Sequence, residues 1–118
     1  MKLMPHHVLV WVSDMNRAVS FYTEILELPL LFKSSHFSKI GGEKFWISLH
    51  IDSKSLIERK AEKGSIINFK PDNMEEAYKI LKEKSVEFYH ELHEEVPGIW
   101  IAEFFDSEGN RLALSTAE

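Results

Sequence analysis

The stretch that decides the fold is His7-Val-Leu-Val-Trp-Val-Ser-Asp14-Met-Asn-Arg-Ala-Val-Ser-Phe21-Tyr22. The segment 7–12 is largely apolar and rich in β-branched and aromatic residues, which predicts a strand buried on both faces. Asp14 suits a helix N-cap, because its carboxylate can accept from the unpaired amides of a first helical turn. Apolar residues then recur at helical spacing as far as Pro29, so a helix is expected to follow the strand and to end before that proline.

The composition is that of one globular domain. Its 118 residues are 44% hydrophobic and 28% charged, and a chain of this length can bury its own core. It has no cysteine, which excludes disulfides, thiolate metal sites and thiol catalysis. The net charge of −5 comes without a basic stripe, which argues against a nucleic-acid partner. No long apolar run indicates a signal peptide or a membrane segment, so we expect a cytoplasmic protein with no membrane partner.

Outward from the opening stretch, the chain contains the same pattern twice. The first half is completed by expected strands at 30–32, 36–40 and 44–51, and the polar residues 52–64 are expected to be a linker. The second half begins with a strand at 65–69 and a helix from Asp72 to about Lys84, with Glu75 in capping-box position. The remaining elements expected are a strand at 86–89, an acidic loop at 90–97, a strand at 99–105, a turn at 106–110 and a strand at 111–115.

These elements predict an α+β fold in a single domain, 1–118, made of two βαβββ units at 1–51 and 65–118. The two expected capping residues, Asp14 and Asp72, lie 58 residues apart, about half the chain, which supports an internal repeat.

The opening motif resembles that of the vicinal oxygen chelate superfamily, which includes glyoxalase I, bleomycin-resistance proteins and extradiol dioxygenases. Its features are a histidine on the first strand, an aspartate seven residues later and Phe-Tyr one turn further on, here His7, Asp14 and Phe21-Tyr22. The turn 106–110 is similar to the closing Asp-Pro-x-Gly-Asn signature of the family, with Ser107 in place of proline. The resemblance covers nearly the whole chain and implies two curled sheets around a shared cleft.

In enzymes of this superfamily up to four side chains hold a divalent metal. The resemblance places these ligand positions at His7, Ser48, Ile66 and Ala113, and of these only His7 is a strong ligand. His50 lies two residues beyond Ser48 on the same strand face and is a displaced replacement. We therefore expect no cofactor, and we keep a divalent metal at His7 and His50 as the disfavoured alternative.

Alternation along the expected strands selects residues that can line the cleft. Tryptophans can stack on a flat ligand, Arg111 can pair with an anion, and His7 and His50 are candidates for general acid or base. The plainer interpretation is that the tryptophans are core, Arg111 is a surface charge and the run 90–95 is a solvated acidic loop. The expected ligand-binding residues are His7, Trp11, Trp46, Ser48, His50, Asn68, Trp100, Phe104 and Arg111.

Three functional hypotheses follow. The first is a metal-free protein, homodimeric by the resemblance, that binds a small organic molecule in an aromatic cleft, with antibiotic sequestration as one version. The second is an enzyme of the same fold (a lyase, dioxygenase or thiol transferase) that uses an atypical site at His7 and His50, with a metal or with the two as acid and base. The third is a structural or regulatory module with no ligand, which the apolar Ile66 and Ala113 favour.

Overall fold

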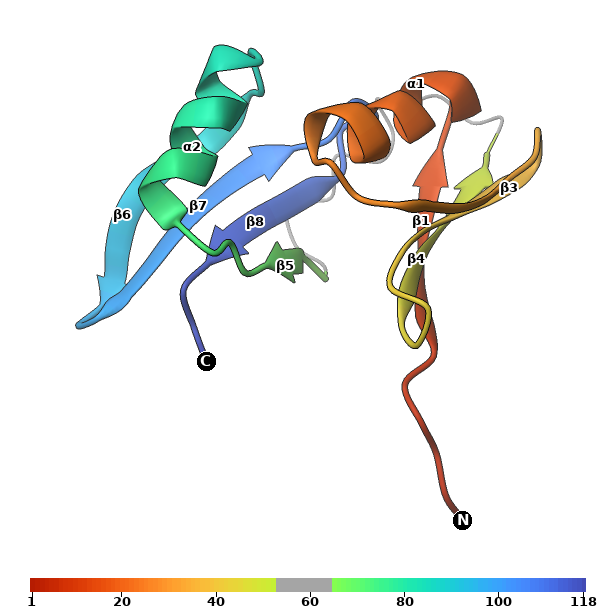
Figure 1. The fold of residues 1–118 in the computed structure, drawn as a ribbon, viewed down its shortest axis with the longest axis horizontal. Coiled ribbons are helices and arrows are strands. Elements are labelled where there is room, and N and C mark those ends of the chain that lie inside the picture. The colour runs from red at the N-terminus through yellow and green to blue at the C-terminus, as the bar shows by residue number, and fades with distance from the viewer. Residues whose placement is uncertain (53–64) are drawn as a thin grey trace. The chain divides into compact units, whose positions relative to one another are not determined.

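A computed structural model describes residues 1–52 and 65–118 (Figure 1). The chain separates into two compact units, Met1–Arg59 and Lys60–Glu118, each with one four-stranded sheet. The two units have the same order of elements, which confirms the predicted α+β fold. The expected linker lies, apart from Asp52, outside the described residues.

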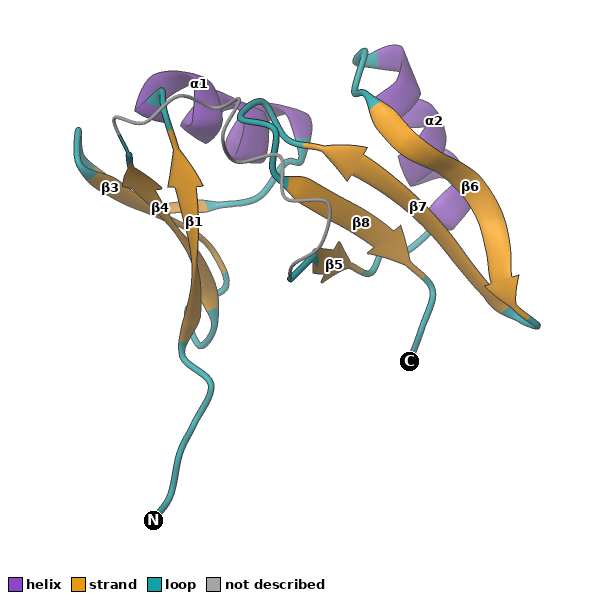
Figure 2. Cartoon of the chain, turned by 180° about the vertical axis from the view of Figure 1, so that it is seen from behind, coloured by secondary structure: helices purple, strands orange, loops and turns teal. Residues whose placement is uncertain are grey.

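The first unit has a mixed sheet of strand order β1-β4-β3-β2, seen from behind in Figure 2. β1 pairs parallel with β4, whereas β3 pairs antiparallel with β4 and β2 antiparallel with β3. The parallel β1–β4 pair brings the first and last strands of the unit side by side. The strands are β1 His7–Val12, β2 Leu30–Lys33, β3 Phe37–Gly41 and β4 Trp46–Ile51.

The helix of this unit begins where the sequence predicted. Asp14 is the N-cap of α1 (Met15–Ser20), and its side chain accepts a hydrogen bond from the Arg17 amide at 3.0 Å. The helix continues as a π-helical segment, η1 (Phe21–Ile25), in which the Leu26 amide bonds to the Phe21 carbonyl. Glu27 then adopts a left-handed φ of 60°, which ends the helix two residues before Pro29.

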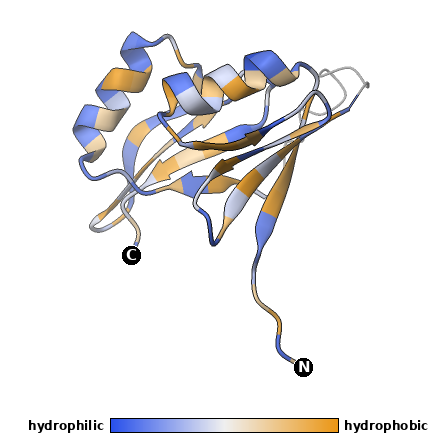
Figure 3. Ribbon diagram, turned by 45° about the vertical axis from the view of Figure 1, so that its right-hand side comes forward, coloured by the Kyte–Doolittle hydropathy of each residue, from blue (hydrophilic) through white to orange (hydrophobic). Residues whose placement is uncertain are grey.

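The second unit repeats this topology with strand order β5-β8-β7-β6. β5 pairs parallel with β8, and β7 pairs antiparallel with both β8 and β6. Its helix α2 is Met74–Glu83, and its strands are β5 Ile67–Phe69, β6 Phe88–Val96, β7 Ile99–Phe105 and β8 Arg111–Ser115. Both helices carry alternating hydrophobic and hydrophilic bands, as amphipathic helices on a sheet should (Figure 3).

The predicted cap of α2 is wrong by one residue. Asn73, not Asp72, has the extended backbone of an N-cap, and its side chain accepts from the Glu76 amide at 3.0 Å. Asparagine and aspartate cap about equally well, so composition alone could not choose between two adjacent candidates. Glu76 rather than Glu75 consequently occupies the third helical position.

The predicted acidic loop at 90–97 is also wrong. β6 runs from Phe88 to Val96 and pairs along most of β7, and the turn at Pro97–Gly98 closes a long hairpin. The three glutamates and two histidines of 90–95 suggested a loop, but β6 is the edge strand of its sheet, where such side chains can point to water. The pairing of β6 with β7 contains three shifts of register, as β-bulges produce.

Each sheet buries the face that its helix covers. In the first unit the buried strand residues Val10, Val12, Ile40, Ile47 and Leu49 lie on the face against α1. The other face of β1 is exposed, with Leu9 at 40% and Trp11 at 47%, so the prediction that β1 is buried on both faces is wrong. None of the helices in the described residues is long and apolar enough to cross a membrane.

The closing turn is held by its aspartate. Asp106 Oδ1 accepts from the amides of Glu108 and Asn110, each at 2.8 Å, and Oδ2 accepts from Asn110 Nδ2 at 2.9 Å. Gly109 has a φ of 81°, a conformation that glycine adopts without a side-chain clash. These contacts explain why aspartate, glycine and asparagine occur at this spacing before β8.

Candidate functional site

The first candidate site is the face of the first sheet that α1 leaves uncovered. The strand register arranges its side chains in three rows across the sheet. One end row contains His7 and Trp46, and the other contains Trp11, His50 and Phe37. The row between them crosses all four strands. We call these residues the aromatic face, and they are His7, Leu9, Trp11, Phe32, Phe37, Lys39, Trp46, Ser48 and His50.

Ring contacts organise one end of the aromatic face around Trp46. The His7 ring stacks on Trp46 with centroids 5.4 Å apart and planes 5° apart, and the His6 ring meets Trp46 edge-on at 4.3 Å. The Lys39 ammonium lies 4.9 Å from the centroid of the same indole. His6 and His7 are also joined through their Nδ1 atoms, 2.8 Å apart. Trp46 is thus surrounded by three basic side chains.

The other end of the face is built around His50. Its ring stacks on Phe37 with centroids 5.6 Å apart and meets Trp11 edge-on at 6.1 Å. Its Nε2 shares a 2.9 Å hydrogen bond with the buried Ser48 hydroxyl. Five of the nine residues predicted to bind a ligand therefore lie together on one surface of the first unit.

The second candidate site is the corresponding face of the second sheet, away from α2. Asn68, Ala113, Glu103 and His90 form one row across all four strands. His90 Nδ1 lies 2.6 Å from Glu103 Oε2, and Asn68 Nδ2 donates to the Ile66 carbonyl at 3.1 Å. We call this surface the charged face, and it contains Asn68, Tyr89, His90, Glu103, Phe105, Arg111 and Ala113.

Arg111, predicted to bind an anion, is engaged within the charged face. Its guanidinium lies 4.8 Å from the centroid of the Tyr89 ring. Burial raises the pKa of Tyr89 to about 12, and the negative charge of Glu103 adds to this increase while Arg111 opposes it. The phenol is therefore neutral over the physiological range.

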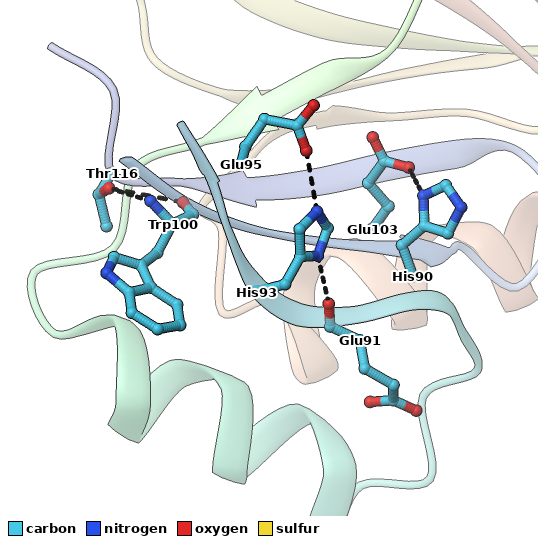
Figure 4. A network of polar contacts seen from close by, with 7 residues as sticks. All are labelled: His90, Glu91, His93, Glu95, Trp100, Glu103 and Thr116. Atoms are coloured by element: carbon cyan, nitrogen blue, oxygen red, sulfur yellow. Dashed lines mark hydrogen bonds and ion pairs between the residues drawn. The ribbon is translucent and has the colours of Figure 1, made fainter. Parts of the chain in front are cut away.

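The two sides of the β6–β7 hairpin differ in chemistry, as Figure 4 shows. His93 lies on the side of His90, where it bonds to the Glu91 carbonyl oxygen at 2.7 Å and to Glu95 at 2.8 Å. These two acceptors raise the pKa of the His93 imidazole, the carbonyl more than the carboxylate. On the opposite side, the Glu91 carboxylate accepts from Tyr78 and Lys82 of α2.

Two predicted binding residues lie on this α2 side, away from Asn68 and Arg111. Phe104 is fully buried in the core and contacts Phe88 at a centroid distance of 5.5 Å. Trp100 is 43% exposed, and its indole points toward α2 (Figure 4). Alternation correctly placed each on its own strand face. It did not reveal that the face of β7 with Trp100 and Phe104 continues into the buried face of β8. Arg111 lies on the opposite face of β8.

The donor atoms at the family's four metal positions do not fit a divalent metal. His7 supplies an imidazole, but its ring is stacked on Trp46, and the Ser48 hydroxyl is bonded to His50. Ile66 and Ala113 offer no side-chain donor at all. Among the described residues, no group of three or more His, Asp or Glu side chains is arranged to hold a metal ion.

His7 and His50 are too far apart to bind the same metal ion. His7 pairs with Trp46 and Trp11 pairs with His50, so the two histidines occupy opposite ends of the face. Four residues of strand correspond to about 13 Å at roughly 3.3 Å per residue. Two imidazoles that bind one metal need nitrogens at about 2.0–2.1 Å from it, which upright side chains at these positions do not provide.

Several residues of the two faces were missed from sequence. Phe37 and Lys39 follow from alternation once β3 is known to pair antiparallel with β4. Tyr89, His90 and Glu103 required the correct assignment of β6 as a strand and the register of the hairpin. Alternation of side chains in β7 could be seen in the sequence, but the charged residues of 90–95 concealed that β6 is a strand that pairs with it.

The fold and its motifs define a family. The sequence profile of the glyoxalase/bleomycin resistance protein/dioxygenase superfamily matches residues 5–114, so the chain belongs to this superfamily. This confirms the resemblance drawn from His7, Asp14 and the closing turn. Among curated proteins, no match to the chain was found.

Solved structures agree with this assignment at the level of the fold. A protein of unknown function from Agrobacterium tumefaciens is 19% identical with a TM-score of 0.81, covering 100% of this chain and 97% of that chain. A superfamily member from Sphaerobacter thermophilus is 23% identical with a TM-score of 0.77 and 97% coverage of both chains. A lactoylglutathione lyase from A. tumefaciens is 14% identical with a TM-score of 0.75, covering 97% of this chain and 93% of its own.

Proposed function

We propose that this chain binds a small organic molecule on the aromatic face without a metal ion. The observation that carries the proposal is the pairing of solvent-exposed aromatic surface with fixed polar groups. Trp11 and Leu9 are exposed on β1, while the imidazole of His50, held by a hydrogen bond to the buried Ser48 hydroxyl, lies beside them. Binding sites for small molecules combine apolar area with a few placed polar groups in this way.

The poor fit of the metal positions supports the metal-independent form of the proposal. The His7 imidazole, which is stacked on Trp46, is by itself a weak binding site for a metal ion. Ile66 and Ala113 supply no further ligand. A stacking surface needs no metal to hold a planar molecule, because aromatic contacts contribute about 0.5–1.5 kcal/mol beyond area burial. Sequestration of an antibiotic is one version of this function.

We also propose that the protein is a cytoplasmic homodimer. The edge strand β2 supports the dimer, since its Leu30, Leu31 and Phe32 are all exposed in the single chain. Exposed apolar residues on an unpaired sheet edge favour association with another copy. Analytical ultracentrifugation of the wild type and of Leu31→Glu tests this point, with a monomeric wild type contradicting it.

The test of the binding function is a screen of planar organic molecules by thermal shift, followed by titration of hits against Trp11→Phe and Trp100→Phe. These two tryptophans are similarly exposed but lie in different units. We expect Trp11→Phe to weaken the binding of hits by several-fold and Trp100→Phe to leave it unchanged. Hits affected by Trp100→Phe alone would contradict the proposal.

Metal dependence is tested separately. Elemental analysis after incubation with Zn²⁺, Ni²⁺, Mn²⁺ or Fe²⁺ is expected to show no bound metal above background in wild type. Near-stoichiometric metal that is lost in His7→Ala would overturn the metal-independent form and favour the enzyme hypothesis. In that case dicarbonyl adducts and catechols become the substrates to assay.

A further inference from the structure

The ionisable side chains of the aromatic face are His7, Lys39 and His50, and all three are of the basic type. The four strands of the first unit contain two lysines and two histidines, and they contain neither aspartate nor glutamate. By contrast, four glutamates lie on β6 and β7 of the second unit. The acidic residues next to the strands of the first unit are Asp14, two residues after β1, Glu43, in the β3–β4 turn, and Asp52, directly after β4. A surface with only basic ionisable groups favours an anionic partner.

The basic groups are gathered at one end of the face. Lys39 and His7 both contact the Trp46 ring, and His6 meets its edge. Lys39 belongs to the central row, where it pairs across from Ser48, and its ammonium extends to Trp46 in the end row. The other end has Trp11 as its exposed ring. The central row is separated from the Trp11 row by two residues, about 6.6 Å along the strands at roughly 3.3 Å per residue, and Lys39 also lies two strands across from Trp11.

We propose, resting on the binding function above, that the ligand is an aromatic anion, with its carboxylate or equivalent acid directed to Lys39 and His7 and its ring over the central row, toward Trp11. His7 and Trp11 are four residues apart on β1, about 13 Å at roughly 3.3 Å per residue, so a fused ring with an acid group attached directly can lie between them. The ammonium supplies a charge-assisted hydrogen bond, and His7 Nε2 supplies a second donor. The stacking of His7 on Trp46 holds that donor in place.

The experiment uses naphthoate, its neutral amide and naphthylmethylamine as probes of one shape and three charges. Affinity is measured by calorimetry on the full chain, and the indole N–H resonances of the three tryptophans, assigned by single Trp→Phe variants, report where each probe binds. We expect naphthoate to bind about tenfold more tightly than the amide, in line with one charge-assisted contact, and the amine to bind most weakly. The Trp11 and Trp46 resonances should move, and the Trp100 resonance should not.

Lys39→Met is the decisive variant, and Lys33→Met is its matched control. Lys33 lies on the same sheet but pairs with Ser38, on the opposite face from Lys39. Lys39→Met should reduce the affinity for naphthoate to that of the amide while leaving the affinity for the amide unchanged. Lys33→Met should change neither value. His7→Gln, which keeps a donor but removes the imidazole, should weaken the binding of naphthoate more than that of the amide.

The outcomes separate the two proposals. Equal affinity for naphthoate and the amide, with movement of the Trp11 resonance, would overturn the anion inference and leave the binding function standing. If no probe moves Trp11 or Trp46, while Trp11→Ala converts a dimer to a monomer in the ultracentrifuge, the face is an interface between copies and both proposals fail. Tighter binding of the amine, or equal losses for all three probes in Lys39→Met, would also overturn the anion inference.

Discussion

The two units share one topology and differ in what they place on it. In the first unit the central row of the open sheet face contains Leu9, Ser48, Lys39 and Phe32. The corresponding row in the second unit contains Asn68, Ala113, Glu103 and His90. At the third position of this row the first unit has a basic residue, Lys39, and the second unit has an acidic residue, Glu103. Strand pairing fixes where a side chain stands, but the residue at that position decides the chemistry.

Exposed apolar area shows the same contrast. Of the large hydrophobic residues that are exposed in the described parts of the chain, 1–52 and 65–118, only Val96 and Trp100 belong to the second unit. The second unit instead covers its edge strand with charges, including Glu91, Glu94 and Glu95 on β6. The first unit therefore has the surface expected of a binding or association site, and the second has that of a solvated sheet edge.

The largest effect we predict tests which residues belong to the core and which to the open faces. Phe104→Ala should lower the free energy of unfolding by about 3–5 kcal/mol, because a fully buried ring is removed from the core of the second unit. Trp11→Ala should cost about 1 kcal/mol or less, because the half-exposed indole of Trp11 stands on an open face. Urea denaturation followed by circular dichroism measures both values. Equal losses would show that Trp11 is packed as core and would remove the contrast between the faces.

A smaller effect concerns the ionisation of Tyr89 on the charged face. The raised pKa of about 12 means that unfolding lowers the pKa of this phenol toward 10.0. The unfolded state then loses the proton first, so the stability that Tyr89 contributes is complete below pH 10 and is lost as pH rises through 12. Ultraviolet titration of tyrosinate should show a transition near pH 12 that is absent in Tyr89→Phe.

Two further variants divide this shift among its causes. Glu103→Gln removes a negative charge and should lower the pKa of Tyr89 part of the way, since burial is the larger cause. Arg111→Gln should raise the same pKa further. A transition near pH 12 that persists in Tyr89→Phe would assign it to another of the three tyrosines in the chain.

Sequence patterns predicted the first unit better than the second. Its strands and the Asp14 cap follow from alternation, helical spacing and a single suitable capping residue. The charged run at 90–95 hid β6, because local composition favours a loop while pairing with β7 favours a strand. Local sequence cannot report that pairing, since the partner strand is separated from β6 by the hairpin turn and the register contains irregularities.

The candidate site was predictable where one strand register sufficed. His7, Trp11, Trp46, Ser48 and His50 share a face because β1 and β4 pair directly and in phase. Grouping Trp100 and Phe104 with Arg111 required the phase between β7 and β8, which alternation within each strand leaves undetermined. The metal positions needed no such structural information, since the sequence alone shows that Ile66 and Ala113 have no side-chain donor.

The smallest effect we predict compares the helix caps of the two units. Asn73→Ala should lower the free energy of unfolding by about 1 kcal/mol, because the Glu76 amide loses its acceptor. Asp14→Ala should cost a similar amount, because the Arg17 amide depends on Asp14 in the same way. Asp72→Ala, one residue before the true cap, should change stability by less than about 0.5 kcal/mol. A loss in Asp72→Ala as large as that in Asn73→Ala would shift the start of α2 by one residue and restore the 58-residue spacing of the two caps that the sequence suggested.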